Sequence, residues 1–154
     1  MEAASGAGAA RREGARRTLA PAFCLVTGLV LIAAGVLGFF FGGADFTSGP
    51  GVSGETFIVF EVNGWHNVVH VATGAFLVLM AASASTAITG ALVFGVVYVA
   101  VTVLGFIDGD DLLTLAPINT ADNFLHLALA IAGIVVGVAA GGLVGSARRR
   151  PAAT

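Results

Sequence analysis

Four long apolar stretches, separated by short polar segments, dominate the pattern of this chain. They cover residues 19–41, 63–82, 88–107 and 121–145. Each is about as long as the roughly 20 helical residues that cross a bilayer. Only a short uncharged turn separates the second stretch from the third, so these two should form a tight antiparallel pair. The pattern predicts an all-α integral membrane protein, a bundle of four transmembrane helices.

The predicted membrane domain covers residues 19–145 and is flanked by two short tails. Residues 1–18 and 146–154 are rich in alanine, glycine and arginine, and we expect the first of these tails to be disordered. Hydrophobic residues make up 57% of the 154 residues and charged residues only 10%, whereas a soluble domain carries about 25% charged residues. The first apolar stretch is also longer than the roughly 15-residue core of a cleaved signal peptide. We therefore expect it to be a transmembrane helix.

Charge is distributed unevenly along the chain. All seven basic residues lie in the two tails, and seven of the nine acidic residues lie between the first apolar stretch and the start of the fourth. Positive charge marks the cytoplasmic side of a membrane protein. Both termini are therefore predicted to be cytoplasmic, with two acidic loops outside. The tails could also contact anionic lipid, but they are too short for us to expect nucleic-acid binding.

The chain contains an internal repeat. The tetrapeptide Val-Leu-Gly-Phe ends the first apolar stretch at residues 36–39 and returns at the end of the third, at residues 103–106. The pattern Asn-x-x-[His/Asp]-Asn-x-x-His then opens the second stretch and, 56 positions later, the fourth. Each half is therefore predicted to be one helical hairpin. Two such duplicated hairpins, inserted in the same orientation, are related by an axis along the membrane normal.

The repeated polar pattern contains all three histidines of the chain. Positions i, i+3, i+4 and i+7 share one face of a helix, and polar side chains avoid lipid. Each copy should therefore form a polar stripe that faces the bundle interior, near the outer surface and opposite its counterpart. This predicted polar cluster consists of Asn63, His66, Asn67, His70, Asn119, Asp122, Asn123 and His126.

The polar cluster has a structural and a chemical interpretation. Structurally, Asn63 and Asn119 suit helix N-caps, Asp122 suits a helix N-terminus, and the other groups would hydrogen-bond and clamp the second helix to the fourth. Chemically, histidines with a carboxylate are plausible ligands for zinc or another transition metal. A haem between His70 and His126 is a further alternative. The four candidate metal ligands are His66, His70, Asp122 and His126.

Two further patterns concern packing and the outer loops. Glycine recurs every fourth residue in the last stretch, a spacing that lets helix backbones approach closely, either within the chain or in a homo-oligomer. Three acidic residues at 108, 110 and 111 resemble part of a calcium loop but are more simply a solvated turn. The glycines are Gly133, Gly137, Gly141 and Gly145.

No nucleophile with a paired base is apparent, so we expect a protein that is not an enzyme, and no cofactor is predicted outright. The leading hypothesis is an integral membrane protein whose paired motifs clamp two helices, as a subunit or partner of a membrane complex. The alternative is a metal-binding or haem-binding membrane protein that uses the histidine and aspartate side chains at the outer face. A third hypothesis is a small proton-coupled transporter.

Several segments resemble a known family: residues 62–63 and 66–70 (VN and HNVVH), residues 117–126 (PINTADNFLH), and the positions of Gly95, Tyr98, Gly105 and Phe106. The family consists of small four-helix membrane proteins of bacteria, mainly actinobacteria, and is described as domain of unknown function 4383. Residues 64–65 (GW) depart from its pattern, which has a proline and an aliphatic residue there. That proline would favour the first helical position, so the start of the second helix is less firmly predicted. The resemblance implies a bacterial inner-membrane location and implies no activity.

Overall fold

The computed structural model describes residues 2–109 and 111–147, and four helices make up most of that part of the chain. They are α1 (Glu2–Phe41), α2 (Gly64–Met80), α3 (Ala84–Asp108) and α4 (Thr120–Ala147). The segments Thr18–Phe41, Ala84–Asp108 and Thr120–Gly141 are each long and apolar enough to cross a membrane, and α2 is apolar but shorter. The predicted fold class, a helical integral membrane protein with a four-helix bundle, is confirmed.

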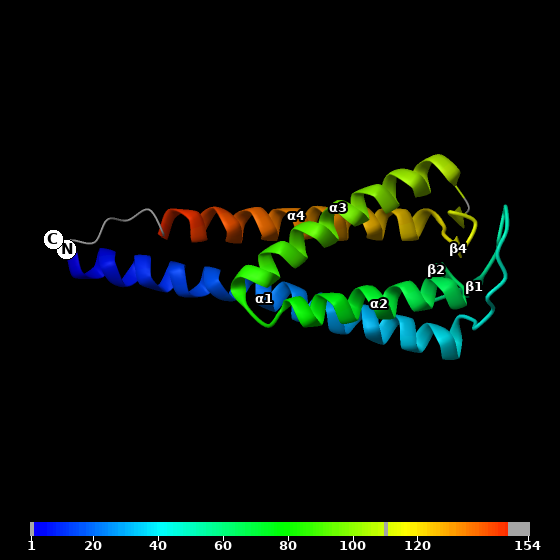
Figure 1. Cartoon of the computed structure of the whole chain (residues 1–154), viewed down its shortest axis with the longest axis horizontal. Coiled ribbons are helices and arrows are strands. Elements are labelled where there is room, and N and C mark those ends of the chain that lie inside the picture. The colour runs from blue at the N-terminus through cyan, green and yellow to red at the C-terminus, as the bar shows by residue number, and fades with distance from the viewer. Residues whose placement is uncertain (1, 110, 148–154) are drawn as a thin grey trace.

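The helices pair as two hairpins. α1 lies along α2, and α3 lies along α4, with fewer contacts between the pairs (Figure 1). Both ends of the described chain lie at one end of the bundle, and the two loops that follow α1 and α3 lie at the other (Figure 1). This arrangement places the starts of α2 and α4, where the two polar motifs lie, side by side at the loop end.

Equivalent small residues let the helices of each hairpin cross closely. A Cβ added at Gly28 of α1 would come within 2.7 Å of the Gly74 carbonyl oxygen of α2. A Cβ added at Gly95 of α3 would come within 3.0 Å of the Ala130 carbonyl oxygen of α4. Gly95 follows Gly28 by the same 67 positions that separate the two Val-Leu-Gly-Phe segments. The duplication seen in the sequence is therefore also present in the helix packing.

The glycines of α4 face α3. A Cβ at Gly133 would lie 2.9 Å from the Ala91 carbonyl oxygen, and a Cβ at Gly137 would overlap the side chain of Leu92. At Gly141 the nearest atom would be a methyl carbon at 3.4 Å, an ordinary contact. Gly145 lies within α4, but its surroundings fall outside the described residues. The described part of the stripe thus packs within the chain.

The helix boundaries differ from the predicted ones mainly at the N-terminus. α1 already begins at Glu2, so residues 2–18 are helical and not disordered as the sequence suggested. Alanine and arginine, which are frequent there, have high helix propensity and can continue the apolar helix. α3 begins at Ala84, four residues before the predicted start, because Ser83 and Thr86 form a capping box. Residues 148–154 of the predicted C-terminal tail lie outside the described residues.

Each of the two loops that follow α1 and α3 folds into a small antiparallel β-hairpin, which the sequence did not predict. β1 (Glu55–Phe57) pairs with β2 (Phe60–Val62), and β3 (Asp111–Leu112) pairs with β4 (Ala116–Pro117). Ile58 and Thr114, which are 56 positions apart, both have positive φ angles, 63° and 59°. The repeat therefore extends through the loops, and the β-hairpins cover the starts of α2 and α4.

Candidate functional site

The first asparagine of the motif caps α2 and holds the opposite loop. Asn63 is the N-cap residue, and its Oδ1 accepts a hydrogen bond of 2.9 Å from the backbone N–H of His66. Its Nδ2 donates to the carbonyl oxygen of Leu115, in the loop of the other repeat, at 2.9 Å. One buried side chain therefore both starts a helix and joins the two halves of the protein.

Asn119 makes the equivalent contacts from the second repeat. Its Oδ1 accepts from the backbone N–H groups of Ala121 and Asp122, at 2.9 and 3.1 Å. Its Nδ2 donates to the carbonyl oxygen of Val59 at 2.9 Å. Val59 precedes Leu115 by 56 positions, so the two cross-loop bonds are related by the internal repeat. The N-cap roles expected for Asn63 and Asn119 agree with this geometry, while their cross-loop partners are backbone atoms that side-chain patterns do not reveal.

The second asparagine of each motif packs inside its own hairpin. Asn67 and Asn123 are both buried, and a Cβ at Gly38 or Gly105 would overlap the Oδ1 atom of the asparagine that faces it. Neither Oδ1 atom has a hydrogen-bond partner among the described residues, whereas Nδ2 of Asn67 donates to the Gly43 carbonyl at 3.0 Å. These two residues therefore join α1 to α2 and α3 to α4, and they do not reach across to the other repeat.

The position at which the motifs differ has a matching difference in the opposite loop. Nδ1 of His66 lies 3.1 Å from the carbonyl oxygen of Pro117 and 3.0 Å from that of Glu61. Oδ2 of Asp122 accepts from the backbone N–H groups of Glu61, at 3.0 Å, and Asn119, at 2.9 Å. Glu61 and Pro117 are themselves 56 positions apart. Proline has no backbone N–H, so Pro117 can offer only its carbonyl oxygen, which accepts from a donor such as His66. Glu61 has a backbone N–H, which it donates to the carboxylate of Asp122.

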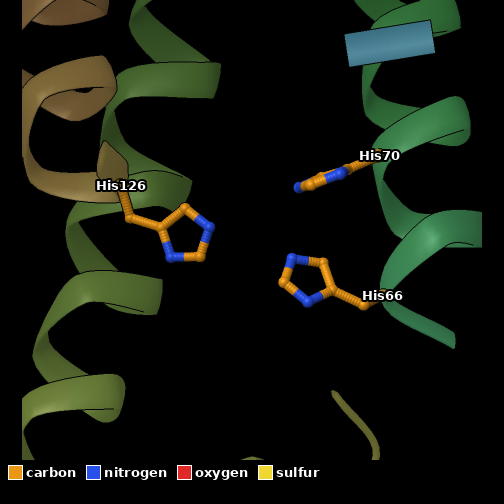
Figure 2. Close-up of side chains that lie close together, drawn as sticks. All are labelled: His66, His70 and His126. Carbon is orange, nitrogen blue, oxygen red and sulfur yellow. The ribbon is translucent and has the colours of Figure 1, made fainter. Parts of the chain in front are cut away.

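Three imidazole rings converge between α2 and α4. His66 and His70 project from α2, and His126 projects from α4 toward them (Figure 2). One nitrogen from each ring can be chosen so that all three lie within 4.8 Å of one another. The ring centroids of His66 and His70 are 4.5 Å apart, and those of His66 and His126 are 6.2 Å apart. Asp122, which the sequence placed in the same ligand set, is not part of this group. The structure thus brings together three of the four candidate ligands.

The hydrogen bonds of His66 determine which of its nitrogens is free. Both partners of Nδ1 are carbonyl oxygens, which only accept, so Nδ1 carries the proton and Nε2 keeps its lone pair. His126 is 5% exposed, and its Nδ1 has no hydrogen-bond partner among the described residues. An unsatisfied buried polar atom costs about 1–3 kcal/mol. The cluster therefore holds a ring that lacks the hydrogen bond its burial would normally require.

A small cavity of about 70 Å³ adjoins the three rings. Tyr98 of α3 lines it and stands edge-on to His126, with ring centroids 5.4 Å apart. A water molecule occupies about 30 Å³ of liquid, so the cavity has room for an ion with one or two waters. Pockets for organic ligands are about 300–1,000 Å³. The remaining wall is mainly apolar and includes Val69, Val97, Val101, Leu112 and Ile118.

The acidic segment at the end of α3 connects the two loops by hydrogen bonds and is not simply a solvated turn. Asp111 is only 7% exposed. Its two carboxylate oxygens accept from the backbone N–H groups of Gly51, at 2.9 Å, and Thr114, at 2.7 Å. Asp108 is exposed, and Asp110 lies outside the described residues. Asp111 therefore bonds the first loop to the second, at a distance in sequence that no local pattern could indicate.

Comparison with known proteins gives a family and no activity. No curated protein and no solved structure matches the chain. One family model, described as a domain of unknown function (DUF4383), matches residues 22–139, which include both helical hairpins and both polar motifs. Since the match covers most of the chain, the protein belongs to the DUF4383 family.

Proposed function

We propose that this integral membrane protein binds a transition-metal ion through His66, His70 and His126. The observation that carries the proposal is the convergence of three imidazole nitrogens within 4.8 Å of one another. Three histidines with one open position are the ligand set of several zinc sites, and imidazole also suits copper, iron and nickel. Metal–nitrogen bonds of about 2.0–2.1 Å place the ligand atoms about 3.4 Å apart, so modest side-chain rotations would bring all three rings onto one ion.

The surroundings of His66 support a ligand role. A metal-binding histidine usually donates its other ring N–H to a carbonyl or carboxylate, which fixes the tautomer and the ring orientation. Nδ1 of His66 has two such carbonyl partners, Glu61 and Pro117. Its Nε2 is therefore oriented and unprotonated before any ion arrives.

A helix clamp alone leaves two of the histidines unexplained. The caps and the bonds between the loops are made by Asn63, Asn119 and Asp122, with Nδ1 of His66. His70 and His126 make none of these bonds. The bonds between the repeats therefore account for Asn63 and Asn119, and metal binding accounts for the remaining rings. A cavity of about 70 Å³ also favours an ion over a haem.

The proposal is tested by metal analysis of protein purified in mild detergent. Chelator-treated protein would be dialysed against Zn²⁺ or Co²⁺, or against Cu⁺ under reducing conditions, and the bound metal measured. We expect about one ion per chain in the wild type and a loss of binding in His70→Ala and His126→Ala. Thr73→Ala is the matched control, because Thr73 lines the same cavity without offering an imidazole.

His70→Ala is the most informative variant. No hydrogen bond to the His70 ring is found among the described residues, so removing the ring should leave the caps and the loops in place. Circular dichroism would verify that each variant remains helical. Folded wild-type protein that retains none of these ions would refute the proposal, as would unchanged binding by folded His70→Ala and His126→Ala.

We also infer that both termini face the cytoplasm of a bacterial cell, with the histidine cluster near the outer face of its inner membrane. Both ends of the described chain lie at one end of the bundle (Figure 1), and all seven basic residues lie in the terminal segments of the sequence. A cysteine at Ser53, which is exposed in the first loop, should react with an impermeant thiol reagent on intact cells. A cysteine at Ser5 should react only after permeabilisation. Reaction of both on intact cells would overturn this orientation.

A further inference from the structure

Asp122 is a buried carboxylate whose hydrogen-bond partners among the described residues are all uncharged backbone groups. Its side chain is 2% exposed, and the hydrogen bonds that it accepts come from two backbone N–H groups, those of Glu61 and Asn119. All seven basic residues lie within the first 17 or the last seven positions of the chain. Both ends of the described chain are at the opposite end of the bundle from the loops (Figure 1). Burying a charge is costly unless it is paired, so a cation beside Asp122 would supply a partner that the described residues do not.

We propose that the carboxylate of Asp122 balances the charge of the cation held by the three histidines without coordinating it. We also propose that Asp122 positions His66 as a ligand. This inference rests on the proposed metal site. Asp122 does not join the converging imidazole nitrogens, so its carboxylate acts without coordinating the ion. Glu61 connects Asp122 to this cluster, because its backbone contacts both the Asp122 carboxylate and the His66 ring.

Asp122 positions His66 indirectly, through the backbone of Glu61. Asp122 accepts from the backbone N–H of Glu61 at 3.0 Å, and the carbonyl oxygen of the same residue lies 3.0 Å from Nδ1 of His66. The carboxylate therefore fixes the strand residue that keeps the proton of His66 on Nδ1. Groups that orient a metal-binding histidine in this way typically change metal affinity by about 10–100-fold when they are removed.

The counter-charge role makes a prediction that depends on the charge of the ion. Three neutral imidazoles contribute no charge, so a bound Zn²⁺ keeps its full charge of two and a bound Cu⁺ its charge of one. Coulomb energy is proportional to the charge of the ion. Removing the charge of Asp122 should therefore cost Zn²⁺ about twice as much binding free energy as Cu⁺.

Asp122→Asn is the variant that tests this. It preserves the shape of the side chain and an oxygen that can accept from Glu61 and Asn119. We expect binding of Cu⁺ to weaken about tenfold and binding of Zn²⁺ about 100-fold. The matched control is Asp111→Asn, which neutralises another buried loop carboxylate that accepts two backbone N–H groups. Because Asp111 bonds neither Glu61 nor His66, this control should weaken Zn²⁺ binding less than Asp122→Asn does.

Two spectroscopic measurements separate the possible failures. The visible spectrum of bound Co²⁺ should be the same in the wild type and in Asp122→Asn, because no ligand changes. In metal-free protein, nitrogen NMR should show His66 protonated on Nδ1 in the wild type and in Asp122→Asn, which keeps the acceptor for Glu61, and a mixture of tautomers in Asp122→Ala, which removes it.

If the Co²⁺ spectrum of Asp122→Asn shows the loss of an oxygen ligand, Asp122 coordinates the ion and the proposed role is wrong. An equal loss of affinity for Zn²⁺ and Cu⁺ in this variant would overturn the counter-charge role. An unchanged tautomer in folded Asp122→Ala would overturn the positioning role. A wild type that binds no ion would overturn the metal site itself, and the tautomer measurement would still decide the link from Asp122 to His66.

Discussion

Replacing Asn63 by alanine should destabilise the protein more than the same change at Asn119, its equivalent in the second repeat. Each asparagine accepts bonds from the first turn of its helix, a contribution of about 1 kcal/mol. Each also donates to a carbonyl of the opposite loop, which contributes about 0.5–1.5 kcal/mol. Asn63 is 2% exposed and its bond to the Leu115 carbonyl is partly buried, so water replaces the lost donor less readily there. The bond from Asn119 to Val59 is exposed, where water can take over. We expect losses of about 2–3 kcal/mol for Asn63→Ala and about 1 kcal/mol for Asn119→Ala.

A third variant separates the cap from the cross-loop bond. Serine at position 63 can still cap α2 but is too short to reach Leu115, so Asn63→Ser should recover about 1 kcal/mol of the loss seen with alanine. Unfolding in detergent, followed by the helical circular dichroism signal over a denaturant titration, gives the three free energies. Equal losses for the two alanine variants would refute the reasoning from burial. A serine variant no more stable than the alanine variant would show that the cap contributes nothing.

Two further predictions concern glycine packing and the two positions, His66 with Pro117 and Asp122 with Glu61, at which the repeats differ. Gly38→Ala and Gly105→Ala should each cost about 1–3 kcal/mol, because the added methyl would overlap a buried asparagine oxygen. Gly14→Ala, with no atom within 4 Å of the added Cβ, should be neutral or slightly stabilising; equal melting temperatures for the three would contradict this. His66→Asp should lose about 1–3 kcal/mol because a carboxylate would face the Pro117 carbonyl. Adding Pro117→Ala supplies an N–H and should restore part of that loss, so strict additivity in the double-mutant cycle would contradict the pairing.

The helices and their repeat could be predicted from the sequence because lipid imposes a simple rule. A membrane-crossing segment must be apolar over about 20 residues, and residues 88–107 show this directly. The β-hairpins could not be predicted. Their strands are only two or three residues long, and their turns use Ile58 and Thr114 at positive φ, where glycine would have been the recognisable signal.

The candidate site was predictable as a set of residues and less so as a geometry. The shared helix face correctly grouped His66 with His70, and the internal repeat indicated that His126 would face them. Asp122 was assigned to the same set because the sequence gives its helix position but not its partners. Those partners are backbone atoms, chiefly the N–H of Glu61, and backbone groups leave no trace in a pattern of side chains. The absence of an N–H at Pro117 was visible in the sequence, but it had meaning only once the two loops were known to cross.

The two repeats differ at two equivalent positions. The first has Glu61 and His66 where the second has Pro117 and Asp122. This difference bears on the ancestry of the protein. Suppose that an ancestor was a single hairpin that assembled as a symmetric dimer. If that hairpin had carried the sequence of the second repeat, each aspartate would have faced a proline, and neither carboxylate would have found the cross-loop N–H. Gene conversion that copied the second repeat over the first would produce the same fault. The proline and aspartate of the second repeat therefore fit a first repeat that offers an N–H at the matching position, as Glu61 does.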